Sequence, residues 1–171
     1  MTDESEEPKI LSVRPLTTAD YIKMLSEQSE AGNALVLAGL VEDWLQKLLL
    51  HVARPMSNKA AKALFEGAGH LSTFSAKIEI AYAFRMLGDT TYNDLVAIKN
   101  IRNRFAHTIK FVSFSSEEIT KACERLTGWH KGCDNSALYL ARTKACVDDI
   151  SGRIERQLWV HALQDEPGSR S

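Results

Sequence analysis

Apolar residues at helical spacing are the feature of this 171-residue chain that most restricts its fold. Between residues 34 and 53, large apolar side chains recur at three- and four-residue steps, as on one face of an α-helix. They are Leu37, Leu40, Val41, Trp44, Leu45, Leu48 and Leu49. Similar patterns predict helices over 72–87 and 135–163 and a shorter one leading to Leu126, whereas no convincing strand pair or internal repeat occurs. We therefore predict an all-α fold, a single-domain helical bundle with long central and C-terminal helices.

Breaks between these segments set their expected ends. Pro55 stops the 34–53 helix, Gly88 closes the 72–87 helix, and the S-x-x-E pattern from Ser115 to Glu118 predicts a capping box. We also expect short helices over 20–30 and 57–65, a segment over 111–114 that could be extended, and a weak point at Gly152 within the last helix. The domain should span 15–164, between an acidic tail over 1–14 and a polar tail over 165–171, both expected to be flexible.

Charge and composition exclude several classes of protein. Lysine and arginine total 21 against 22 acids, a net charge of −1, so no global field would attract DNA or an anionic membrane. No apolar run approaches the roughly 20 residues of a membrane span, and the acidic N-terminus does not resemble a secretion signal. An odd number of cysteines without repeated spacing indicates reduced thiols. We expect a cytoplasmic protein with no membrane contact.

The segment from Asn93 to Lys110 is predicted to form a helix with both a buried and a chemical face. Its apolar stripe comprises Leu95, Ile98, Ile101 and Phe105. Beside that stripe, an arc of about 140° holds a guanidinium, an ammonium, a carboxamide and an imidazole, from Arg102, Lys99, Asn103 and His107. Four cations and no acid lie between residues 99 and 110, namely Lys99, Arg102, Arg104 and Lys110. The arc is thus a local positive site in a nearly neutral chain.

This arc carries the chemistry that cleavage of RNA without a metal would need. A histidine near neutral pKa can transfer protons, and an arginine can clamp phosphate oxygens through two hydrogen bonds. The candidate catalytic residues are Arg102, Asn103 and His107, and the candidate phosphate-binding residues are Lys99, Arg104 and Lys110. One motif supplies one histidine, so two chains side by side would complete the acid and base more easily. The alternative is a surface basic patch with Asn103 and His107 hydrogen-bonded near the helix end.

Two other residue groups favour structural explanations. The Gly67/Gly69 loop lacks the preceding strand and the glycine spacing of phosphate-binding loops, so it is predicted to connect two helices. Cys123, His130 and Cys133 do not have the spacing of a zinc finger, and no fourth ligand is evident. We expect no metal site and no cofactor.

The motif R-N-x-x-x-H from Arg102 to His107 resembles the R-x(4–6)-H signature of HEPN domains, all-α modules that often dimerise around it. A longer resemblance covers roughly residues 64–126, through LFEGAGHLSTFSAKIEIAYAFRMLG, YNDLVAIKNIRNRFAH and SFSSEEI. This stretch is similar to the MltR family, named for the mannitol operon repressor and related in fold to HEPN domains. The resemblance implies a homodimer, with Arg102, Asn103 and His107 at the positions that are catalytic in HEPN ribonucleases.

Three functions remain open. The first is an MltR-like regulator of gene expression acting through a protein or RNA partner. No helix-turn-helix, zinc finger or basic arm is readable and the net charge is −1, so autonomous sequence-specific DNA binding is not expected. The second is a toxin-like, metal-independent endoribonuclease of the HEPN type, with His107 as acid/base and Arg102 as phosphate clamp. The third is a non-catalytic interaction module.

Overall fold

The computed structural model describes residues 29–107 and 112–164, and the side chains as far as residue 156. Within these ranges the chain forms six helices and no strand, which confirms the predicted all-α class. The helices are α2 (Glu30–Val52), α3 (Asn58–Phe65), α4 (Phe74–Ala83), α5 (Asp89–His107), α6 (Glu117–Cys123) and α7 (Asn135–Gln164).

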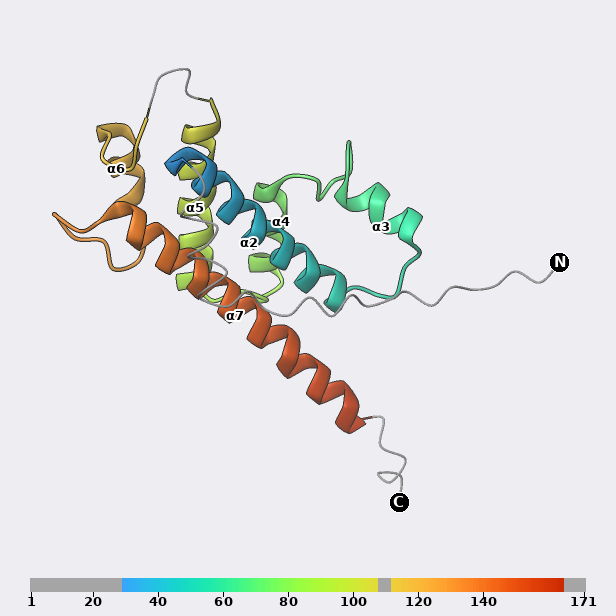
Figure 1. The fold of residues 1–171 in the computed structure, drawn as a ribbon. Helices are drawn as coiled ribbons and strands as arrows, with labels where there is room; N and C mark the ends of the chain where they lie inside the picture. The colour runs from blue at the N-terminus through green and yellow to red at the C-terminus, as the bar shows by residue number, and fades with distance from the viewer. Residues whose placement is uncertain (1–28, 108–111, 165–171) are drawn as a thin grey trace.

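Three long helices, α2, α5 and α7, pack against one another and form the centre of the bundle (Figure 1). α4 packs on α2 and α5, and the short α6 packs on α5 and α7. The apolar stripe predicted for the 93–110 segment lies in this core: Leu95, Ile98 and Ile101 are fully buried and Phe105 is nearly so. α5 also packs on α4 and on α6, so one of its faces beside the buried stripe meets α6.

α4 ends earlier than the sequence pattern indicates, at Ala83 instead of Leu87. Its C-terminus is a Schellman motif, in which Met86 N–H donates to Ala81 O at 2.8 Å and Arg85 N–H donates to Tyr82 O at 2.9 Å. Arg85 occupies the left-handed position with φ 59°, where a glycine is usual. The expectation that Gly88 closes this helix was therefore wrong, because an arginine takes the glycine role.

Other element ends also differ from expectation. α6 is capped at Ser116 with no side-chain cap bond, so the capping box predicted from Ser115 was wrong. The Ser116 hydroxyl instead accepts from Ser113 N–H at 3.0 Å, and the chain turns at residues 114–115. Residues 112–114, the described part of the segment that could be extended, form no strand. α7 continues through Gly152 without a break. The helix predicted over 20–30 and the end of the 93–110 helix lie largely outside the described residues.

Candidate functional site

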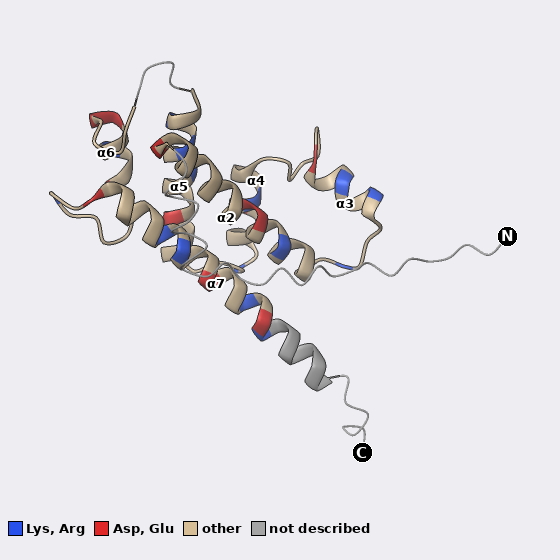
Figure 2. Ribbon diagram, in the orientation of Figure 1, with Lys and Arg blue, Asp and Glu red and all other residues tan. Residues whose placement is uncertain are grey.

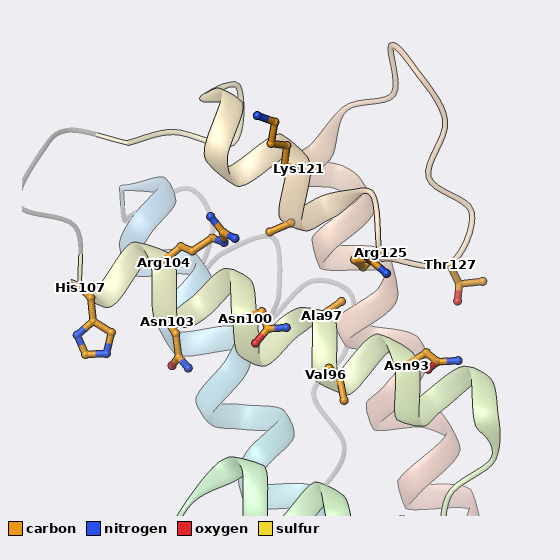
Figure 3. A pocket seen from close by; sticks show the side chains of 11 residues that line it. Asn93, Val96, Ala97, Asn100, Asn103, Arg104, His107, Lys121, Arg125 and Thr127 are labelled. Atoms are coloured by element: carbon orange, nitrogen blue, oxygen red, sulfur yellow. The ribbon is translucent and has the colours of Figure 1, made fainter.

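An open groove of about 1030 Å³ runs between one face of α5 and the segment formed by α6 and the loop after it (Figure 3). The α5 side is lined by Asn93, Val96, Ala97, Asn100, Asn103, Arg104 and His107. The opposite side is lined by Lys121, Ala122, Arg125 and Thr127. Among these described lining residues there is no acid and no Phe, Tyr or Trp, so the groove is a basic, amide-rich surface.

Helical spacing explains why these α5 residues share one face. The lining positions recur every three or four residues from Asn93 to His107, beside the buried stripe of the same helix. The small side chains of Ala97 and Ala122 are both buried where α5 and α6 meet. Their size lets the two helices approach closely, and the longer polar side chains extend around this apolar floor.

The buried carboxylate of Asp94 ties the two sides of the groove together. Its Oδ1 accepts from Thr127 N–H at 2.8 Å, at the end of the α6 side. Its Oδ2 accepts from Arg142 Nε at 2.9 Å and Nη2 at 2.6 Å, on α7. Since Asp94 is fully buried, these charge-assisted bonds replace the hydration that its carboxylate loses. The loop after α6 is thus held against α5 and α7.

A second network fixes the other end of α6. Asn135 Nδ2, at the start of α7, donates to Phe114 O at 2.9 Å and to Thr120 Oγ1 at 3.0 Å. Its Oδ1 accepts from Trp129 Nε1 at 3.1 Å. Phe114 N–H in turn donates to the Glu30 carboxylate on α2 at 2.7 Å. The groove is therefore built on segments that side-chain hydrogen bonds hold in place.

Three cations give the groove its charge: Arg104 on α5, Lys121 on α6 and Arg125 just after α6. Lys121 Nζ lies 2.6 Å from Glu117 Oε1, and both side chains are largely exposed. This hydrogen bond and the carboxylate charge raise the pKa of Lys121, so the ammonium stays charged, while neighbouring Arg104 acts in the opposite direction. Elsewhere, as along α7, cations and acids alternate (Figure 2). In the groove, by contrast, the charged side chains among the described lining residues are all cations.

The structure brings together some of the predicted site residues and separates others. Asn103, Arg104 and His107 all line the groove. Arg102 does not line it; its Nη1 donates to Asn103 Oδ1 at 2.9 Å. Burial raises the pKa of Tyr139 on α7, and the charge of Arg102 opposes that rise. Asn103 thus accepts a hydrogen bond from Arg102 and lines the groove with His107, whereas Arg102 lies outside the lining.

The remaining predicted phosphate-binding residues contribute less to this surface. Lys99 is half-buried and does not line the groove, and Lys110 lies outside the described residues. The sequence analysis missed Lys121 and Arg125, whose approach to α5 depends on tertiary packing. It also missed Asn93 and Asn100. Asn100 follows Asn93 by seven residues and precedes Asn103 by three, and these spacings place all three asparagines on one helix face.

No group of three or more His, Cys, Asp or Glu side chains that could hold a metal ion occurs in ranges 29–107 and 112–156. Within the described part of the chain, no helix has a segment of the length and apolar character required to cross a membrane. The groove presents cationic and hydrogen-bonding side chains.

Comparison with known proteins gives matches at the level of structure. No model of a protein family matches the chain, and no curated protein sequence does. A structure of the MtlR–HPr complex from Escherichia coli matches with a TM-score of 0.53 and 16% identity, over 79% of this chain and 93% of that chain. A structure of YggD from Shigella flexneri 2a, described as a possible transcriptional regulator, matches with a TM-score of 0.55 and 10% identity, over 84% and 98%.

At these identities the likeness concerns the fold. It agrees with the resemblance to the MltR family that residues 64–126 indicated, because MtlR is the mannitol operon repressor. The chain has the all-α fold of MtlR and YggD.

Proposed function

We propose that this protein regulates gene expression by binding a protein partner in the groove between α5 and α6. The observation that carries the proposal is a groove with cationic and carboxamide lining, and no acid among its described lining residues, on a chain of net charge −1. Such a surface suits the acidic face of another protein, since complementary charge guides association and favours the correct partner. The shared fold supports a partner-dependent role, because MtlR has been solved as a complex with HPr.

The charge balance argues against autonomous DNA binding. Proteins that bind duplex DNA neutralise several phosphates, and their affinity depends on the number of such contacts. The groove offers three cations, and Lys121 already pairs with Glu117. With a net charge of −1, the rest of the chain adds no attraction. We propose that the protein acts as a homodimer and leaves operator recognition to other factors.

HPr is the partner to test first. Isothermal titration of purified full-length protein with HPr should show saturable binding, and Arg125→Glu should weaken it at least about tenfold by placing an acid in the groove. Arg156→Glu on α7 is the matched control, because it makes the same charge change at an exposed site outside the groove and should leave affinity unchanged. No binding of HPr, or tight sequence-selective binding of DNA from the protein's own locus at physiological salt, would contradict the proposal.

A second candidate function is metal-independent cleavage of RNA. It is favoured by the position of Asn103 and His107 on the groove beside Arg104, so a proton-transfer group lies next to a phosphate-binding one. A second copy would have to supply a further acid or base. The test is incubation with mixed RNAs in EDTA, with products analysed for cyclic phosphate ends. Cleavage that both His107→Ala and Arg102→Ala abolish would support the enzyme, and intact RNA over a broad range of substrates would contradict it.

A further inference from the structure

We infer that the groove between α5 and α6 takes an extended acidic peptide segment of the protein partner, read through its backbone as well as its charge. This inference rests on the proposed function and names the chemistry of the partner segment. It follows from how the lining residues divide between the two sides of the groove. The α5 side carries three carboxamides, and the cations lie mainly on the α6 side.

The carboxamides of Asn93, Asn100 and Asn103 form the first half of this pattern. Each carboxamide has both donors and an acceptor, the same pair of functions that a peptide backbone presents at every residue. From Asn93 to Asn103 the row spans ten residues, about 15 Å of helix. Backbone donors and acceptors on one edge of an extended peptide recur at every second residue, about 7 Å apart, so the row can hydrogen-bond groups on one edge of a segment of about four or five residues.

The cations supply the other half. Lys121 and Arg125 lie across the groove from the asparagine row, and Arg104 lies toward the His107 end (Figure 3). In an extended segment, alternate side chains point to opposite sides. Acids at every second position would face Lys121 and Arg125, while the backbone meets the carboxamides. The small floor residues Ala97 and Ala122 leave room for the main chain to approach closely.

The described lining residues include no Phe, Tyr or Trp, which favours peptide over single-stranded RNA. Proteins that bind single strands without duplex structure stack bases on aromatic rings, each worth about 1–3 kcal/mol. Among the described residues that line this groove, the single imidazole of His107 is the one aromatic ring. The groove's hydrogen-bonding groups are instead carboxamides on a rigid helix, which suits the regular spacing of a peptide backbone.

The test is fluorescence anisotropy on the full-length protein with a labelled peptide of about twelve residues alternating Glu and Ser. We expect saturable binding, no binding of the same peptide with Lys in place of Glu, and weaker binding of a uridine oligonucleotide of equal length. Asn100→Ala should weaken peptide binding about fivefold, the loss of one hydrogen bond of about 1 kcal/mol. Asn58→Ala, an exposed asparagine on α3 away from the groove, is the matched control and should change nothing.

A peptide with N-methyl groups on its serine residues separates backbone reading from simple charge attraction. It keeps every carboxylate but loses alternate backbone donors, and we expect at least about a tenfold loss of affinity from two or more missing hydrogen bonds. Equal affinity for the methylated peptide, or tighter binding of the oligonucleotide, would overturn the inference. So would a large gain in affinity when Asp3, Glu4, Glu6 and Glu7 are neutralised to amides, since the chain's own acidic run would then be the occupant.

Competition with HPr distinguishes this inference from the proposed function. If HPr binds and the Glu–Ser peptide neither binds nor competes, the extended-peptide inference fails and the partner-binding function stands. If the peptide binds with the expected Asn100 and N-methyl dependence while HPr does not bind, the groove's preference for an acidic peptide stands and the proposed function through HPr fails.

Discussion

Asp94 is the residue on which the geometry of the groove depends most. Asp94→Ala leaves the Arg142 guanidinium without its carboxylate and Thr127 N–H without its acceptor. Because Asp94 is fully buried, we expect a loss of about 3 kcal/mol in the free energy of unfolding, measured by urea denaturation. Asp43→Ala is the control: it breaks an exposed pair with Lys47 and should cost less than about 1 kcal/mol. Equal losses in the two variants would contradict the anchoring role.

The three thiols should differ sharply in reactivity. Burial raises the pKa of Cys123 and of Cys146 to about 12, whereas Cys133 is half-buried. The thiolate is the reactive form, so a raised pKa keeps Cys123 and Cys146 protonated and slow at about pH 8, and still mostly protonated near pH 10. We expect Ellman's reagent to modify one thiol quickly in the folded protein and three in denaturant. Cys133→Ser should remove the fast phase, and a fast phase that survives this substitution would disprove the assignment.

At the scale of elements, alanine substitutions at two glycines should change the stability of the fold in opposite directions. A Cβ at Gly69, in the connection between α3 and α4, would lie 2.3 Å from the backbone oxygen of Leu64, so Gly69→Ala forces the loop to move. A Cβ at Gly39 within α2 meets nothing within 4 Å. We expect Gly69→Ala to lower the free energy of unfolding by about 1–3 kcal/mol, and with it the midpoint of thermal unfolding. Gly39→Ala should raise the free energy of unfolding by up to about 1 kcal/mol, and the midpoint with it. The same sign for both changes would refute this account of the loop.

The helices were predictable because their signal is local. In α2 and α5 the apolar residues recur at the helical period, and the predicted stripe from Leu95 to Phe105 is buried as expected. The end of α4 was not predictable, since nothing in the sequence marks Arg85 as the residue that takes the left-handed position. Helix ends depend on a few backbone hydrogen bonds, and these can form around an arginine at a modest conformational cost.

The candidate site was predictable only on one of its two sides. Asn103, Arg104 and His107 share a face of α5 because of helical geometry, which the spacing of residues fixes. Lys121 and Arg125 lie on a different helix and its following loop, and their approach depends on the buried Asp94 and on packing between Ala97 and Ala122. The sequence analysis placed Arg102 and His107 at the two ends of one arc of about 140°, and the groove includes His107 but not Arg102.

At the scale of the whole molecule, the groove is a fixed feature of the bundle. α5 is held between α2 and α7 by the core, and hydrogen bonds to Asp94 and Asn135 attach the α6 segment to α5 and α7. A site on packed helices loses little conformational freedom on binding, so most of the binding energy goes into affinity. The partner would therefore meet a surface already shaped for it.

A local basic groove on a molecule of net charge −1 predicts a particular dependence on salt. Attraction to an acidic partner acts over about 10 Å at 0.1 M salt and over much less at higher salt. We expect affinity for HPr, measured by titration calorimetry, to fall several-fold as sodium chloride rises from about 0.05 to about 0.5 M. Arg125→Glu should flatten this dependence because it removes a groove cation, whereas Arg156→Glu should retain the slope. Affinity that is independent of salt in the unsubstituted protein would mean that the groove's charge does not guide the partner.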